Sequence, residues 1–169
     1  MRAPEGSLLM RASESGSAPR REPSPGQGTA AGTVLAFDFG ERFTGVAVGE
    51  CSLGVAHPLG LIVAQGGAAR MEEAAGLVAE WRPGLLVVGL PLSMDGAEHE
   101  MTRRCRRFAR QLEARFGVPV KLVDERLSST EAEGLLRAAG RGGRKHKLRT
   151  HEVSAQIILQ SYFDDPGTA

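Results

Sequence analysis

The chain has 169 residues, of which 41% are hydrophobic and 24% charged, and its formal net charge is +1. These values suit one globular domain with a real core and exclude two large domains. No apolar stretch approaches the roughly 20 residues of a membrane span, and the N-terminus lacks the apolar run of a secretory signal. The two cysteines, Cys51 and Cys105, exclude a disulfide scaffold and have no metal-ligand spacing, so we expect a cytoplasmic protein without membrane contact.

The first 32 residues differ from the rest. Fourteen of them are Gly, Pro or Ser, and they show no periodic apolar pattern. Such a segment cannot bury enough apolar surface to offset the entropy of ordering it. We therefore predict a disordered extension over 1–32 and a folded domain over 33–165.

The first half of the domain predicts a hairpin, one more short strand and a helix. Short apolar runs typical of strands occupy 33–38 and 43–49 and are joined by a turn, as in a hairpin. A third short strand is expected over 54–57 or 60–64. An amphipathic pattern over 70–82 predicts a helix that Pro83 stops.

The second half alternates strands with helices. The unbroken apolar run LLVVGL at 85–90 is typical of a parallel strand buried on both faces. A helix over 98–116 and a strand over 118–123 follow, and Ser128 begins a capping box for a further helix that runs to about 139. A mixed five-stranded α/β sheet flanked by helices results.

The last part of the domain predicts a basic loop and a final helix. Residues 141–149 are rich in Arg, Lys and Gly, which suggests a loop. Thr150 is a candidate N-cap for a helix over 151–163.

Asp38 is the first candidate for chemistry, in the sequence D-F-G-x-x-x-x-G. A carboxylate at the end of a strand can hold a hard cation, and Gly40 and Gly45 would let a phosphate backbone approach the main chain. The equally open alternative is an Asp that serves only the turn.

A second acidic pair, Asp124 and Glu125, ends the later strand and precedes Arg126. Open α/β sheets place their sites at the carboxyl ends of strands. Neighbouring residues on a strand point to opposite faces, so only one of the two can share a site with Asp38. The alternative is that both are solvated charges at an edge.

Phosphate-binding candidates lie in a loop and in two basic segments. Ser93 and its neighbouring backbone N–H groups, in the loop over 91–96, can bind a phosphate or merely connect a strand to a helix. The basic residues are Arg103, Arg104, Arg106, Arg107 and Arg110, then Arg141, Arg144, Lys145, Lys147 and Arg149. Residues 103–149 carry 14 basic and 5 acidic residues, whereas 33–102 carry 3 and 9. The net charge of +1 thus conceals a basic segment suited to nucleic acid.

The motifs DFG at 38–40, GLPLSMDG at 89–96, DERLSSTEA at 124–132 and AQIILQSYF at 155–163 closely resemble the YqgF/RuvX family. Its members are called Holliday-junction-resolvase-like proteins or pre-16S rRNA nucleases. The resemblance covers essentially 33–163. It implies an RNase H-like fold and a cytoplasmic role in trimming the 5′ end of the small-subunit rRNA precursor during ribosome biogenesis.

The resemblance also implies a carboxylate cluster that holds Mg²⁺ or Mn²⁺ for phosphodiester hydrolysis. Asp38 is the central ligand by position, and Glu125 is preferred to Asp124 as the second. The family usually has an Asp where this chain has His151, which can still ligate a metal but brings no negative charge. Glu152, the next residue, is the alternative third ligand.

Four functions compete at this point. A metal-dependent nuclease on structured RNA comes first, and a catalytically impaired nucleic-acid-binding module, favoured by His151, comes second. A Holliday junction resolvase would use the same metal chemistry on DNA. A phosphotransferase of the actin type ranks low because one copy of the domain cannot make its cleft. We expect a nucleic-acid partner and either a monomer or a weak homodimer.

Overall fold

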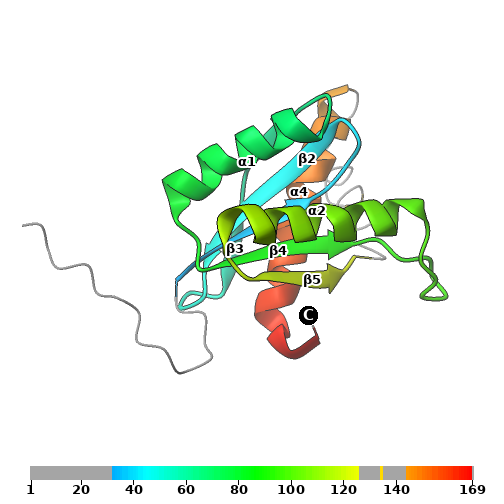
Figure 1. Ribbon diagram of the computed structural model, residues 1–169. Coiled ribbons are helices and arrows are strands. Elements are labelled where there is room, and N and C mark those ends of the chain that lie inside the picture. The colour runs from blue at the N-terminus through cyan, green and yellow to red at the C-terminus, as the bar shows by residue number, and fades with distance from the viewer. Residues whose placement is uncertain (1–31, 126–133, 135–143, 169) are drawn as a thin grey trace, which may run out of the picture.

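The computed structural model describes residues 32–125, 134 and 144–168. Its five strands form one sheet in the order β3-β2-β1-β4-β5. The strands are β1 (Thr33–Asp38), β2 (Phe43–Glu50), β3 (Val55–Val63), β4 (Leu85–Leu90) and β5 (Val120–Asp124). The helices are α1 (Gly67–Trp81), α2 (Glu100–Phe116) and α4 (Arg144–Asp164), and a 3₁₀ turn over Pro166–Thr168 follows (Figure 1). The predicted mixed five-stranded sheet is therefore confirmed.

The pairing of the strands follows from their sequences. β1 pairs antiparallel with β2, as the predicted hairpin requires, and parallel with β4. β4 also pairs parallel with β5, so its apolar run is enclosed on both sides and on both faces. The two alternatives for the third strand are parts of one continuous strand, β3, which accommodates Pro58 because it lies at the sheet edge.

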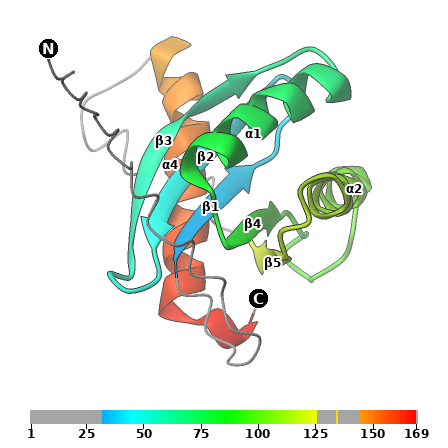
Figure 2. The same cartoon turned by 60° about the vertical axis from the view of Figure 1, so that its left-hand side comes forward.

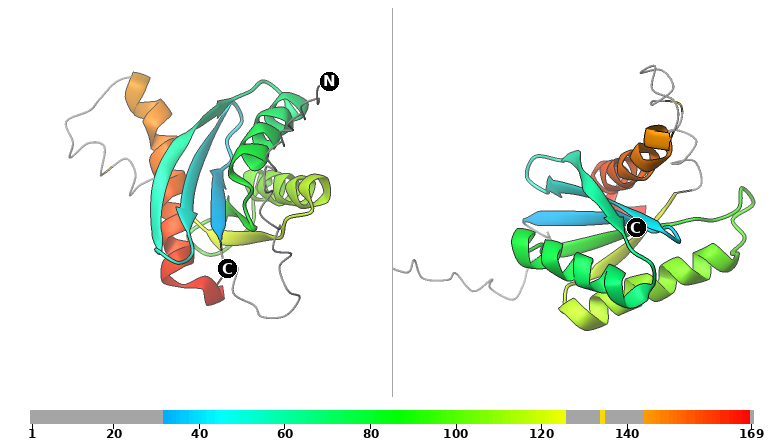
Figure 3. Two further views of the ribbon diagram at one scale, coloured as in Figure 1. Left: turned by 90° about the vertical axis from the view of Figure 1, so that its left-hand side faces the viewer. Right: turned by 90° about the horizontal axis from the view of Figure 1, so that it is seen from above.

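Helices cover the two faces of the sheet unequally. α1 and α2 lie on one face and α4 crosses the other, as Figures 2 and 3 show from several sides. Side chains alternate along β1, so Leu35 and Phe37 join the core under α1 and α2, whereas Val34 and Ala36 join the core under α4. Within the described residues, no helix has both the length and the apolar character needed to cross a membrane.

One prediction near the C-terminus is wrong. The helix α4 begins at Arg144, so most of the predicted basic loop over 141–149 is helical and Thr150 lies inside the helix rather than at its N-cap. Arg and Lys are good helix formers, and no Gly or Pro interrupts residues 144–150. The predicted helix after Ser128, and nearly all of the predicted extension over 1–32, lie outside the described residues.

The main chain of α4 approaches β2 closely at Gly45. A Cβ atom at this position would overlap the carbonyl oxygen of His151 and would lie 3.0 Å from the amide nitrogen of Glu152. Both neighbours are backbone atoms, which cannot rotate away as a side chain can. The space that the sequence suggested for a phosphate backbone at Gly45 is thus filled by the helix.

We predict that Gly45→Ala lowers the free energy of unfolding by about 1–3 kcal/mol or more, because the added methyl group overpacks this contact. Gly76→Ala is the matched control: Gly76 lies in α1 with no atom near its missing Cβ, so alanine there should stabilise the helix by about 0.5–1 kcal/mol. Urea unfolding of both variants measures the difference. Equal stability of the two would contradict the close approach.

Candidate active site

Asp38 and His151 form the centre of the candidate site. Asp38 ends β1 and is 6% exposed, and its side chain follows Val34 and Ala36 onto the α4 face. The His151 Nδ1 atom lies 3.1 Å from the Asp38 Oδ2 atom. An ionised carboxylate can only accept hydrogen bonds, so Nδ1 carries the proton and the Nε2 nitrogen is left for another partner.

Small residues make room for the His151 imidazole. Gly45 lets the α4 backbone reach β2, and a Cβ on Gly40 would lie 3.1 Å from the His151 Cε1 atom. The Phe43 ring lies at 6.1 Å from the imidazole, between centroids, and flanks it at the start of β2. The glycines of the D-F-G-x-x-x-x-G sequence thus place His151 against Asp38.

The Glu125 carboxylate lies on the same face of the sheet, in the space left by the missing side chain of Gly89 in β4. Glu125 follows β5, and its amide donates to the Leu90 carbonyl at 3.2 Å. A Cβ on Gly89 would lie 2.8 Å from the Glu125 carboxyl carbon and 2.5 Å from the Ile158 Cδ1 atom. Ile158 belongs to α4, so the Glu125 carboxylate lies over Gly89 on the α4 face of the sheet.

The strand register brings the two carboxylates to opposite sides of Gly89. Phe37 pairs with Val88 across β1 and β4, so the next residues, Asp38 and Gly89, come alongside each other. Glu125 leans over Gly89 from the other neighbouring strand. Asp124 is exposed and lies one residue earlier on the strand, where alternation turns it away from this face.

The charges of both carboxylates act on Cys105 of α2. This thiol is fully buried, and burial raises its pKa to about 12, with further contributions from the negative charges of Glu125 and Asp38. The thiol therefore stays protonated at neutral pH and is not a nucleophile.

The donors suit a hard divalent cation, although they do not form a compact cluster. Carboxylate oxygens such as those of Asp38 and Glu125 are the ligands that Mg²⁺ and Mn²⁺ prefer, and the imidazole of His151 suits Mn²⁺. Over residues 32–125, 134 and 144–168, no three His, Cys, Asp or Glu side chains group closely enough to hold a metal ion. Of the two candidates for a third ligand, His151 contacts Asp38 directly, at 3.1 Å.

The residues predicted to bind nucleic acid are scattered around this centre. Gly40 lies beside His151, whereas Gly45 is covered by α4. The Ser93 amide already donates to the Ala97 carbonyl at 3.0 Å, which leaves the exposed Ser93 side chain.

The basic candidates divide between described and undescribed side chains. Arg103, Arg104 and Arg107 are exposed on α2. Arg104 pairs with Glu41 at 2.6 Å. Arg126 lies outside the described residues, and only the backbone is described for Arg144, Lys145 and Lys147, within α4.

Two residues of this region did not stand out in the sequence as site residues. Gly89 resembled an ordinary position near the end of a buried strand, and only the absence of a side chain there signalled a close approach. Arg70 resembled a solvated residue at the start of a helix, yet it is 6% exposed and donates from Nη2 to the carbonyls of Gly40 and Glu41, at 3.0 and 2.7 Å.

Comparison with known proteins places this arrangement in a family. A family model for RuvX, described as Holliday junction resolvase, matches residues 32–165. The chain belongs to the RuvX family.

Relatives of this RuvX chain cover the same region. A protein of Methylobacillus flagellatus is 56% identical over 133 residues, which are 79% of this chain and 91% of the relative. One of Thiobacillus denitrificans is 55% identical over 138 residues, or 82% and 95%. Both carry the description "Putative pre-16S rRNA nuclease".

Solved structures support the fold of this RuvX chain. The Fowlpox virus Holliday junction resolvase matches with a TM-score of 0.53 and 7% identity, over 79% of this chain and 99% of that one. Thermus thermophilus RuvC in complex with a Holliday junction substrate gives 0.51 and 17%, over 81% and 98%. The predicted RNase H-like fold is confirmed.

We predict that Cys105 makes the stability of this RuvX protein fall at alkaline pH. The folded-state pKa of about 12 lies above the ordinary value of 9.0, so between these values the unfolded chain loses a proton that the folded chain retains. This stabilising contribution is complete below pH 9.0 and is lost as the pH rises towards 12, by about 1.4 kcal/mol per pH unit.

Urea unfolding at a series of pH values measures this slope in the wild type and in Cys105→Ala. The variant should be less stable below pH 9.0 because it leaves a cavity, but its stability should fall less steeply above pH 9.0, so that the two curves converge. Parallel curves would contradict the assignment.

Proposed function

We propose that this protein is a nuclease that hydrolyses phosphodiester bonds, with Asp38 and Glu125 at its reaction centre. The observation that carries the proposal is the convergence of these two carboxylates at the carboxyl ends of β1 and β5, on opposite sides of Gly89. Membership of the RuvX family, which is described as Holliday junction resolvase, supports it. We propose that the exposed side chains of Ser93 and of the α2 arginines bind the phosphate backbone.

We propose that Asp38 and Glu125 hold a divalent cation, Mg²⁺ or Mn²⁺. When bound, such a cation supplies an activated water and neutralises charge that develops on the phosphate. Burial of Asp38 keeps its carboxylate oriented, and the hydrogen bond to the His151 Nδ1 fixes the imidazole with Nε2 free. His151 takes the place of a carboxylate, so the site carries one negative charge fewer and binds Mn²⁺ in preference to Mg²⁺.

We propose structured RNA as the substrate, and specifically the 5′ end of pre-16S rRNA in the cytoplasm during ribosome biogenesis. The descriptions of relatives that are more than half identical support this choice. A four-way DNA junction is the second candidate, supported by the description of the family model. The presence of His151 at Asp38 also favours a third candidate, a nucleic-acid-binding module with impaired catalysis.

We predict that Asp38→Asn reduces cleavage at least about a hundredfold and leaves the fold intact, since it removes a cation-binding charge worth several kcal/mol but preserves shape. Cleavage of pre-16S rRNA and of a four-way DNA junction should be compared side by side, each with Mg²⁺ and with Mn²⁺. Asp164→Asn, an exposed change at the far end of α4, is the control and should retain wild-type activity. Equal activity of Asp38→Asn and wild type would refute the proposed centre.

We predict that His151→Asp increases cleavage with Mg²⁺, because a third carboxylate strengthens the cation site. The same change places two carboxylates within about the present 3.1 Å contact, so the metal-free variant should be less stable than wild type. Mg²⁺ should therefore raise the melting temperature of His151→Asp more than that of the wild type. The absence of any Mg²⁺-dependent shift in the variant would contradict the cation site, independently of activity.

A further inference from the structure

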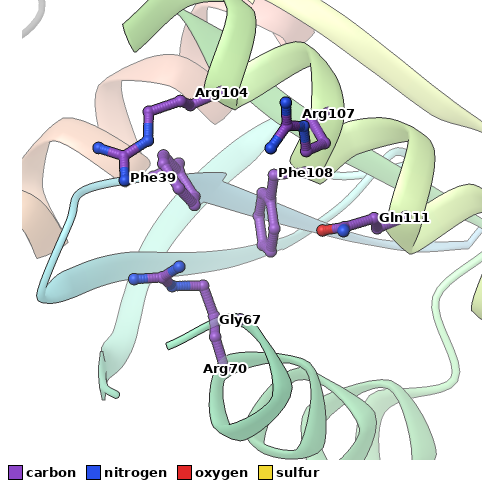
Figure 4. A pocket seen from close by; sticks show the side chains of 7 residues that line it. All are labelled: Phe39, Gly67, Arg70, Arg104, Arg107, Phe108 and Gln111. Atoms are coloured by element: carbon purple, nitrogen blue, oxygen red, sulfur yellow. The ribbon is translucent and has the colours of Figure 1, made fainter. Parts of the chain in front are cut away.

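A hollow on the other face of the sheet lies beside Phe39, the residue that follows Asp38. It has a volume of 210 Å³ and opens between α1 and α2. Arg70 of α1 and Arg104 and Arg107 of α2 line it, together with the rings of Phe39 and Phe108 (Figure 4). Its surface therefore combines three cations with two aromatic walls.

Arg70 is a fixed cation in this hollow. Its residue is 6% exposed, its Nη2 is held by the carbonyls of Gly40 and Glu41, and its guanidinium carbon lies 4.6 Å from the centroid of the Phe39 ring. The buried Nε has no hydrogen-bond partner in the described part of the chain. Burial lowers the pKa of Arg70, and the positive charge of Arg104 lowers it further. The Arg70 guanidinium is thus held in place by hydrogen bonds and lies close to a second positive charge.

The charges around the hollow do not balance. Glu41 is the one carboxylate that pairs with these arginines within the described residues, and it bonds to Arg104 at 2.6 Å. Arg107 is exposed on α2 without an ion pair in that same part of the chain. No acidic residue lies in the first turn of α1, whose first residue, Gly67, is also at the hollow. Three cations thus face a single exposed carboxylate.

The size of the hollow and the residues that line it indicate which kind of anion would fit. Pockets that enclose a whole small molecule usually measure about 300–1,000 Å³, so 210 Å³ suits one group of a longer molecule. Planar guanidinium groups match the paired oxygens of a phosphate, and aromatic rings can contact the attached sugar or base.

The turn at Gly40 connects this hollow to the candidate active site. The Gly40 carbonyl accepts from Arg70, and the Cα of Gly40 packs against the Phe43 carbonyl oxygen and the His151 imidazole. A nucleic-acid strand that is bound at Asp38 and continues past the Gly40 turn would reach Arg70, Arg104 and Arg107.

We infer that Arg70, Arg104 and Arg107 bind a phosphate of the substrate strand near the cleaved bond, on the opposite face of the sheet from the carboxylates. The inference rests on the proposed function, because it assigns this phosphate to the nucleic acid that the active site cleaves.

The test compares Arg107→Gln with Arg110→Gln, a matched loss of one exposed charge on the same helix but outside the hollow. Both changes are made in the full chain carrying Asp38→Asn, without divalent cations, so that binding is measured without cleavage. The probe is a fluorescent RNA stem–loop with a single-stranded 5′ tail, and anisotropy gives its Kd over a series of KCl concentrations.

Arg107→Gln should weaken binding several-fold and reduce the slope of log K against log[salt] by about 1, whereas Arg110→Gln, outside the hollow, should change both by clearly less. Equal effects of the two variants, or no effect of either, would overturn the inference. A free nucleotide is the alternative ligand. It would be favoured, and the inference overturned, if AMP displaced the RNA from the Asp38→Asn chain but not from its Arg107→Gln derivative while the two chains had equal salt slopes.

Cleavage by the two single variants with Asp38 intact separates this inference from the proposed function. Arg107→Gln should raise KM and preserve kcat, because the phosphate it binds does not react. If the wild type cleaves no nucleic acid but Arg107→Gln still changes the salt slope, the proposed function fails and the phosphate site stands.

Discussion

The approach of α4 to β2 at Gly45 is the contact on which the candidate active site depends. It allows the helix backbone to lie against the sheet at His151 and Glu152, and so it sets the height of the His151 imidazole above Asp38. Two turns further along α4, Ile158 fills the space over Gly89 next to the Glu125 carboxylate. The helix α4 thus contributes to the site at both His151 and Ile158. Gly45 and Gly89, which have no side chains, allow it to pack this closely against the sheet.

Side chains alternate between the two faces of the sheet at the carboxyl end of β1, so the two faces differ there. Asp38 faces α4 with Glu125 and His151, whereas Phe39 contacts Phe108 of α2 at 5.0 Å between centroids and supports Arg70. The carboxylates of Asp38 and Glu125 lie on one face, and the guanidinium groups of Arg70, Arg104 and Arg107 line a hollow on the other. A formal net charge of +1 therefore does not exclude local regions of strong charge.

His151 gives the buried Asp38 carboxylate a partner within the protein. The imidazole donates to Asp38 and satisfies one of its oxygens, so a buried carboxylate is hydrogen-bonded even before a cation binds. A carboxylate in that place would repel Asp38 and would need a cation to hold the two together. The pairing of Asp38 with His151 is therefore compatible with a folded site that holds no cation.

Periodicity in the sequence determined much of the fold, because burial of apolar side chains is encoded locally. The hairpin, the doubly buried β4 and the amphipathic α2 all follow from spacing alone, and the resemblance carried by the DFG and GLPLSMDG segments indicated the family. Alternation along a strand also required that only one of Asp124 and Glu125 share a face with Asp38.

Only the tertiary structure decided where distant residues meet. The closeness of His151 to Asp38 and of Ile158 to Gly89 depends on how α4 crosses strands that lie much earlier in the chain, by 113 residues for Asp38 and by 69 for Gly89. A glycine that leaves room for a phosphate leaves the same room for a helix backbone, as Gly45 does. Likewise, Arg70 is buried because the turn after β1 presents two carbonyls to it, and no local pattern in the sequence records that contact.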